Sequence, residues 1–399
     1  MKVVIIVRRL NVRGGTQRQA LELARELKKL GHQVKLYTFL YSPEDCFPGL
    51  LSGLNVVSLD YYPRYSNYII NYIAENIAAL KLARKIDRDT EILNPHDQVS
   101  YRVAVYFKKK IKNIPSVWMS NDLPTKVFSY WKETQSSPNY VAPFYKKILW
   151  RIVDWYEINK FIKPQDAITV LDIMNQKYMR KFIGKDAVVV RSGLDLSEFN
   201  FVKRTPPRNK SAKLLAAGIF FPHRRFEDAI LAAKLLIDDG YKIELNIIGD
   251  YMSDKSYYQK MADLVQKNSL AQNVKFRGKI SDEELHKQYL ANDIFIFPNH
   301  MQTWGLVVME AMASGLPVIV SKTTGAAEVL TDGENALMVN PKSPDEVAKS
   351  VKLLIDDHDL YLRLSQNGRK FVEENISWQK YAHQMLKVFE SAQAKYKTN

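Results

Sequence analysis

The chain has 399 residues, and its 46% hydrophobic and 25% charged residues are proportions found in globular proteins with a buried core. Its length predicts two domains, since one domain usually takes about 100–200 residues. The single cysteine, Cys46, excludes an internal disulfide, and the lack of any run of about 18 apolar residues argues against a membrane-spanning helix.

The formal net charge of +15 favours a polyanionic partner: nucleic acid, anionic lipid or a phosphorylated substrate. At the N-terminus, the apolar residues Met1–Val7 precede Arg8 and Arg9, which is the reverse of the order in a secretory signal. We therefore expect these residues to form a first strand, and we expect a cytoplasmic protein.

The opening segment predicts a strand–helix–strand unit. Lys2–Val7 is a continuous apolar run, typical of a strand buried on both faces of a parallel sheet. A loop at 8–15 ends in Gly14 and Gly15, residues 16–30 have helical spacing of apolar residues, and 33–39 forms the next strand. This is the βαβ pattern of a doubly wound α/β fold.

The same alternation continues to the end of the chain. A Pro-rich, basic stretch at 203–213 interrupts it and predicts an exposed linker. We therefore expect a first domain over 1–202 and a second over 214–376. The sequence leaves open whether a last helix, at about 377–399, packs back on the first domain. Further strands are predicted near 91–95, 115–119, 166–170, 187–191, 214–218, 243–248, 274–276, 294–297 and 317–320.

The strongest local signal for a ligand lies after the strand 294–297. A polar loop containing Gln302 and Thr303 leads through Trp304, Gly305 and Leu306 into a helix. Free N–H groups and the dipole at a helix start suit a phosphate, and glycine lets a ligand approach the backbone. Glu310, within that helix, could accept two hydrogen bonds from a ribose diol. A second small-residue loop, 323–328, is predicted to open another helix.

Residues 298–318, 324–328 and 332–339 resemble the retaining glycosyltransferase family four, which has the GT-B fold. The family pattern runs P-S-x-x-E-x-F-G-L-x-x-x-E-A-M-A-x-G-x-P-V-V, followed by a G-G-x-x-E loop and a D-G-x-x-G-x-L-V turn. The resemblance implies two Rossmann-like domains with parallel sheets that face an interdomain cleft. It implies a nucleoside-diphosphate sugar as donor, transfer of a hexose with retention, and a hydroxyl of a glycan, glycolipid or lipid-linked acceptor.

Two positions depart from the family pattern. The first of two glutamates spaced eight residues apart is Gln302 here, and the second is Glu310. Glutamine can hydrogen-bond hydroxyls but carries no charge, which leaves sugar choice and rate open. In the stretch that resembles G-R-x-x-x-x-K-G, Ile219 replaces the arginine and Arg224 occupies the lysine position. The resemblance assigns Arg224 to the diphosphate leaving group, with Arg225 as a possible further charge.

Other segments extend the expected site. Gly218 begins the stretch just described, and Gly249 ends a strand that resembles the edge of the family's nucleotide site. Gly14 and Gly15 resemble the family's first loop, beneath the diphosphate and sugar. His96 follows a strand at the position where the family contacts the donor sugar or acceptor, although a loop histidine that only caps local backbone is an alternative. We expect catalytic roles for His96, Arg224 and Gln302, no cofactor and no essential metal.

Tyrosine, tryptophan, lysine and arginine gather at 60–85, 105–112 and 140–163. Such a mixture suits a lipid-linked acceptor or peripheral association with the inner membrane surface, and ordinary amphipathic packing accounts for it equally well. Three rival functions remain: a non-catalytic binder of nucleotide sugar, a basic nucleic-acid-binding protein and a nicotinamide dehydrogenase. The chain lacks the sequence motifs of RNA recognition and the G-x-G-x-x-G fingerprint after the first strand, so we expect no nucleic-acid partner.

Overall fold

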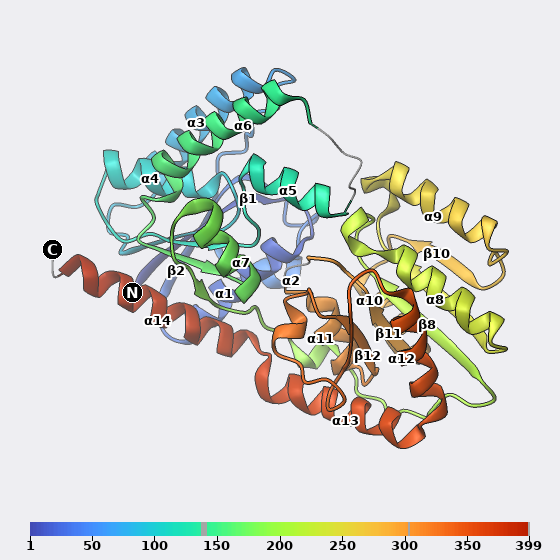
Figure 1. The fold of residues 1–399 in the computed structure, drawn as a ribbon. Helices are drawn as coiled ribbons and strands as arrows, with labels where there is room; N and C mark the ends of the chain where they lie inside the picture. Colours follow the sequence, from blue (N-terminus) through green and yellow to red (C-terminus); the bar gives the residue numbers. More distant parts are fainter. Residues whose placement is uncertain (137–141, 302–303, 398–399) are drawn as a thin grey trace. The chain divides into compact units, whose positions relative to one another are not determined.

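The computed structural model describes residues 1–136, 142–301 and 304–397, and the chain forms two compact units. The first unit contains Met1–Trp131, Ala142–Gly193 and the segment from Trp378 onward, and the second contains Leu194–Ser377 with residues 132–136. The division after Gly193 lies earlier than the boundary at 202 expected from composition. Each unit is described by itself below (Figure 1).

Parallel strands form the centre of the first unit. Four strands pair in the order β3-β2-β1-β4 and three more in the order β5-β6-β7. Isolated parallel bridges between Leu93 and Ser116 and between His96 and Met119 connect β4 to β5. The strands are β1 (Lys2–Leu10), β2 (Gln33–Tyr41), β3 (Asn55–Ser58), β4 (Ile92–Pro95), β5 (Val117–Ser120), β6 (Ala167–Val170) and β7 (Val188–Val189).

Helices cover both faces of these strands. Helix α1 buries its apolar stripe, from Ala20 to Leu27, as the spacing predicts, and Gly31 ends it with a φ of 83°. The other helices are α2 (Pro48–Leu51), α3 (Tyr68–Lys85), α4 (Ser100–Lys110), α5 (Lys126–Ser136), α6 (Phe144–Glu157), α7 (Ile173–Tyr178) and α14 (Trp378–Lys397), and α1 spans Gly15–Lys29. Short π-helical segments at Ile158–Ile162 and Met179–Ile183 extend α6 and α7.

The C-terminal helix α14 belongs to the first unit although it follows the second in sequence (Figure 1). It contacts α1, and it buries Tyr381 and Phe389 completely or almost so. The Tyr396 hydroxyl donates to Asn113 Oδ1 at 3.1 Å. The chain therefore passes back into the first unit at its end.

The second unit is built on one six-stranded parallel sheet of order β10-β9-β8-β11-β12-β13. Its strands are β8 (Ser211–Ala217), β9 (Lys242–Ile248), β10 (Val274–Gly278), β11 (Ile294–Phe297), β12 (Val318–Ser321) and β13 (Leu337–Val339). Its helices are α8 (Phe226–Asp238), α9 (Lys255–Lys267), α10 (Asp282–Ala291), α11 (Leu306–Ala313), α12 (Pro344–Asp356) and α13 (His358–Asn375). Aliphatic residues of β8, β9, β11 and β12 form the centre of its core.

The predicted linker is partly a structural element. Strand β8 begins at Ser211, and Arg204 is buried. The Arg204 guanidinium donates to the carbonyl oxygens of Tyr289, Leu290, Asn292 and Ser314 at 2.7–3.2 Å. These carbonyls lie at the C-terminal ends of α10 and α11, where a cation is favoured by unpaired acceptors and by the helix dipole.

We predict that Arg204→Ala lowers the free energy of unfolding by about 3 kcal/mol, because it leaves several buried carbonyls without donors. Chemical denaturation followed by circular dichroism measures this change. The adjacent Lys203, which is exposed, provides the matched control as Lys203→Ala. Equal denaturation midpoints for the two variants would show that the hydrogen bonds of Arg204 contribute nothing to stability.

Candidate functional site

The strand order of the second unit changes direction between β8 and β11, which makes a topological switch point. In open parallel sheets, ligands bind outside the carboxyl ends of the strands at such a point. Three segments that the sequence singled out follow strands of this sheet directly: 218–225 after β8, Gly249 after β9 and 298–306 after β11.

Gly218 and Gly249 are required for close packing of two backbones. A Cβ atom at Gly249 would lie 1.8 Å from the Gly218 carbonyl oxygen. A Cβ atom at Gly218 would lie 3.2 Å from the side chain of Arg224. The Gly218 N–H donates to Ile248 O at 2.9 Å, and the Gly249 N–H donates to Gly278 O at 3.0 Å. These two glycines therefore position the ends of β8 and β9 and make room for Arg224.

Arg224 ends a short 3₁₀ helix, Pro222–Arg224, and its half-buried guanidinium lies against Gly218. Asn299, from the loop after β11, accepts from Arg224 Nη1 at 2.9 Å and donates to the Arg224 carbonyl at 3.0 Å when its amide is oriented to satisfy both groups. Arg224 Nε has no hydrogen-bond partner among the described residues. Burial lowers the pKa of Arg224 to about 10, so the group stays cationic at neutral pH.

Arg225, which the sequence left as a possible further charge, is neutralised locally. Its guanidinium forms ion pairs with Glu227 at 2.5 Å and with Asp228 at 2.6 Å. Its backbone has a φ of 55°, a left-handed conformation at the position where the family pattern has glycine. The charge of Arg225 is therefore balanced by the two carboxylates at the start of α8.

Helix α11 begins after Gly305, which has a φ of 74° and is the residue that turns the chain into the helix. Leu306 is the first helical residue, and Trp304, just before the turn, is buried. Gln302 and Thr303, both expected at the donor, lie outside the described residues. The helix start that the sequence predicted for an anionic ligand is therefore present next to this loop.

Glu310 lies one turn into α11 and is half-buried. The hydroxyl of Tyr289, at the end of α10, donates to Glu310 Oε2 at 2.8 Å. Burial and the neighbouring Glu310 carboxylate raise the pKa of Tyr289 well above its ordinary value, so the hydroxyl remains a donor. The sequence did not identify Tyr289, because its partner lies 21 residues away on another helix.

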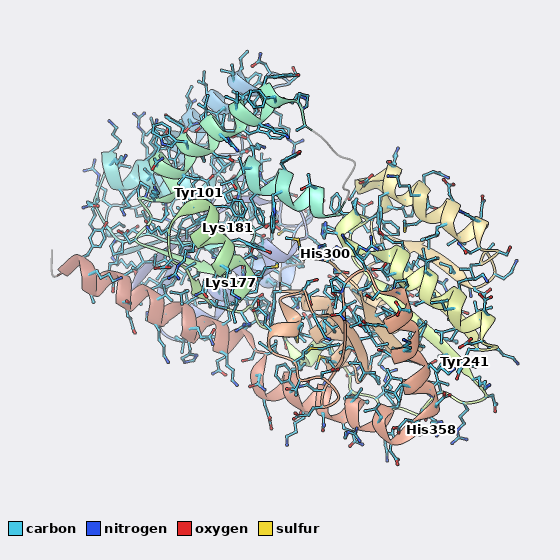
Figure 2. All side chains as sticks on the ribbon, viewed as in Figure 1. Tyr101, Lys177, Lys181, Tyr241, His300 and His358 are labelled. Atoms are coloured by element: carbon cyan, nitrogen blue, oxygen red, sulfur yellow. The ribbon has the colours of Figure 1, made fainter. Side chains whose placement is uncertain are left out.

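His300, labelled in Figure 2, lies in the loop after β11 and contacts the loops after β8 and β12. Its N–H donates to the carbonyl of His223 at 2.7 Å, and its ring Nδ1 lies 3.3 Å from Thr323 Oγ1. Burial, with positive charge from Lys342 and Arg225, lowers the pKa of His300 to about 4, so the ring is neutral at pH 7. The sequence predicted that the loop 323–328 opens a helix. In the structure this loop leads into a single 3₁₀ turn, Ala326–Glu328.

In the first unit, Gly14 and Gly15 lie at the start of α1, after β1. Gly15 is exposed, and a Cβ atom there would have no neighbour within 4 Å. A Cβ atom at Gly14 would lie 2.6 Å from Gln17 Oε1, the end of a flexible side chain. The open space is thus at Gly15, at the N-terminal end of the helix.

His96, for which the sequence predicted contact with the donor sugar or acceptor, is completely buried. Its N–H donates to Ile6 O at 2.8 Å, and its Nε2 lies 2.9 Å from Asn94 Oδ1. Burial lowers the pKa of His96 to about 3. The residue therefore packs directly after β4, where its backbone bonds to β1 and bridges to Met119 of β5.

The first unit contains a polar cavity of about 260 Å³ next to the carboxyl ends of β1, β4 and β5. Glu157 accepts hydrogen bonds there from the hydroxyls of Tyr72 and Tyr101, each at 2.7 Å, and from Arg102 Nε at 2.7 Å. Figure 2 labels Tyr101. The lining residues are Arg8, Tyr68, Asn71, Tyr72, Glu75, Gln98, Val99, Tyr101, Arg102, Pro124, Lys126, Val153, Asp154 and Glu157.

Two Asp-x-Asp triplets, at 87–89 and 357–359, bear on metal binding. Asp87 and Asp89 form ion pairs with Lys35 at 2.9 Å and with Lys2 at 2.5 Å. Asp357 caps α13 by accepting from the Leu360 N–H at 2.9 Å. Within residues 1–136, 142–301 and 304–397, no three His, Cys, Asp or Glu side chains are grouped to hold a metal ion.

Each half of the chain matches a family of glycosyltransferases. Residues 13–198 match the family described as Glycosyltransferase Family 4, and residues 198–371 match Glycosyl transferases group 1. The crystal structure of HepE from Anabaena with UDP and glucose is similar in fold, with a TM-score of 0.72 and 16% identity over 98% of this chain and all of that chain. The fold is therefore the α/β GT-B class with two Rossmann-like units.

Two relatives illustrate the similarity in sequence, one a glycosyltransferase by name and the other a synthase. An uncharacterised glycosyltransferase of Methanocaldococcus jannaschii is 26% identical over 260 residues, which cover 63% of this chain and 63% of the relative. Mannosylfructose-phosphate synthase of Agrobacterium fabrum is 23% identical over 403 residues, covering 94% of this chain and 86% of that enzyme. The two family matches together span residues 13–371, and the chain therefore belongs to the group 1, family 4 glycosyltransferases.

Proposed function

We propose that the chain transfers a hexose from a nucleoside-diphosphate sugar to an acceptor hydroxyl, with retention of the anomeric configuration. The observation that carries the donor assignment is the placement of Arg224 and α11 on either side of the β8–β11 switch point, with Glu310 oriented by Tyr289. The Arg224 cation and the N-terminus of α11 suit a pyrophosphate, and the Glu310 carboxylate suits the ribose of the same ligand. HepE, with UDP and glucose bound, supports the same class of donor.

The leaving diphosphate gains negative charge as the glycosidic bond breaks. Arg224 and the N-terminal end of α11 would stabilise that charge, since both are in place before the reaction. Glu310 would hold the ribose hydroxyls through the carboxylate that Tyr289 orients. Gln302, expected beside the sugar, supplies amide hydrogen bonds without charge. No role in the reaction is assigned to the buried His96.

The acceptor hydroxyl would approach the anomeric carbon from the same face as the one from which the diphosphate leaves. A leaving phosphate oxygen would take the hydroxyl proton while the new glycosidic bond forms. Retention then follows without a covalent enzyme intermediate. We place the hydroxyl-bearing acceptor, a glycan or glycolipid, in the polar cavity of the first unit, because its tyrosine, amide and charged groups suit a polyhydroxylated ligand.

A panel of uridine, guanosine and adenosine diphosphate sugars tests the reaction class. We expect release of one nucleoside diphosphate, undiminished by a chelator, and a product whose anomeric coupling constant in proton NMR matches that of the donor. Thermal stabilisation by a nucleoside diphosphate without release from any sugar donor would instead support a non-catalytic binding protein. An inverted anomeric configuration would overturn the proposed mechanism.

Arg224→Met should lower kcat by about 100-fold, because one fixed cation is removed from the leaving group. Arg224→Lys should recover part of the loss. The control is Arg363→Met, which removes an exposed arginine on α13. Steady-state rates with the donor found in the panel measure the effect, and an unchanged kcat for Arg224→Met would exclude the assigned role.

Tyr289→Phe should weaken binding of the nucleoside diphosphate by about tenfold, since a charge-assisted hydrogen bond to Glu310 is lost. Isothermal titration with that diphosphate gives the affinity. Tyr361→Phe is the matched control, because it removes another buried hydroxyl that donates to Asp293 O, before the start of β11. If both variants lose affinity equally, Tyr289 acts through general stability and does not position Glu310.

A further inference from the structure

Helix α6 buries charged side chains and exposes apolar ones, the reverse of the usual arrangement. Its buried residues are the two acids, Asp154 and Glu157. Asp154 accepts from the backbone N–H groups of Lys126 and Val127, each at 2.8 Å, at the start of α5. Glu157 accepts from Arg102 in the cavity described above. The carboxylates of α6 are thus engaged inside the first unit.

The outward face of α6 is apolar and aromatic. Large side chains recur there at helical spacing, and two of them, Phe144 and Trp155, are 78% and 67% exposed. A soluble helix normally buries such a stripe against its own core. The exposed apolar residues of α6 are Phe144, Tyr145, Ile148, Leu149, Ile152, Trp155 and Tyr156.

Helix α3 presents a similar stripe beside α6. Ile69, Ile73 and Ile77 follow one another at intervals of four residues and are each more than half exposed. The Tyr72 hydroxyl donates to Glu157 at 2.7 Å, and the Tyr72 and Tyr156 ring centroids lie 6.4 Å apart. Figure 1 shows the two helices side by side. Their exposed apolar residues form one surface, which we call the α3–α6 face.

The charged side chains that α3 and α6 expose are all basic. Lys146 and Arg151 are exposed on α6, and Lys81 and Arg84 are exposed on α3. The one acid of α3, Glu75, is directed to Arg102, at 3.2 Å from its Nη1. Every carboxylate of the two helices is therefore engaged inward, while the exposed side chains are apolar, aromatic or basic.

A groove of about 300 Å³ lies along α6, with an apolar lining that includes Phe182 and Ile183. Arg151 and Lys163 contribute basic groups to the same groove. Asp154 also lines the groove, and its carboxylate accepts from the N–H groups of Lys126 and Val127. The apolar side chains and the two cations are complementary to a lipid whose headgroup carries a phosphate. No helix in the described part of the chain is long and apolar enough to cross a membrane.

We propose that the α3–α6 face docks on a membrane surface that contains anionic phospholipid. The isoleucines and Trp155 enter the headgroup region, and the lysines and arginines contact lipid phosphates. A protein partner or a second copy of the chain would need acidic groups to match this charge, and α3 and α6 expose none. The inference does not depend on the sugar-transfer reaction, since it rests on a different surface.

Flotation with vesicles tests the proposal in the intact protein. We expect binding to phosphatidylcholine vesicles containing phosphatidylglycerol and little binding to phosphatidylcholine alone. The double variant Lys146→Glu with Arg151→Glu should reduce partitioning roughly 10- to 100-fold, since each basic residue near an anionic surface adds to the favourable free energy of binding. Lys267→Glu with Lys279→Glu, exposed lysines of the second unit, should leave partitioning nearly unchanged.

The apolar contribution is tested separately with Ile73→Ser and Ile152→Ser, against the control Leu353→Ser on the exposed side of α12. Brominated lipid should quench tryptophan fluorescence in the wild type and much less in Trp155→Phe. Equal binding to neutral and anionic vesicles, quenching that persists without Trp155, or a dimer that the Ile73→Ser and Ile152→Ser substitutions dissociate would each overturn the proposal. Sugar-transfer activity in detergent reports separately on the reaction.

Discussion

A guanidinium that packs against a bare glycine connects the two sides of the candidate donor site. Arg224 comes from the β8 side of the switch point and Asn299 from the β11 side, and their paired hydrogen bonds join the two loops. Gly218 makes this possible because a Cβ atom would press on the Arg224 side chain, and Gly249 lets the ends of β8 and β9 approach each other. The other groups of the candidate site are arranged around the contact between Arg224 and Asn299.

Each unit uses buried polar pairs to orient groups far apart in sequence. In the second unit, Arg204 collects the carbonyls at the ends of α10 and α11, the same two helices that carry Tyr289 and Glu310. In the first unit, Arg102 and two tyrosines surround Glu157. Because α6 buries its acids, its apolar side faces outward, so the proposed docking surface is a consequence of how the cavity is built.

Much of the fold could be predicted because it depends on local patterns. Apolar runs located β1, β8, β9 and β11 to within a few residues, and the helix predicted to follow Trp304 and Gly305 is α11, Leu306–Ala313. The start of this helix was predictable for the same reason, since Gly305 and Leu306 are adjacent in sequence and Glu310 follows within α11. Arg204, by contrast, looks like part of a polar linker, because its four carbonyl partners lie 85 or more residues away.

The sequence by itself determined the alternation of strands and helices, the family, and the helix start at Gly305, because each depends on residue types at short spacing. Only the tertiary structure decided which side chains meet. It buried His96 between strands, paired Arg225 with Glu227 and Asp228, and brought Tyr289 to Glu310. Burial and charge pairing are set by segments that meet only when the sheet has formed, so no local pattern in the chain contains them.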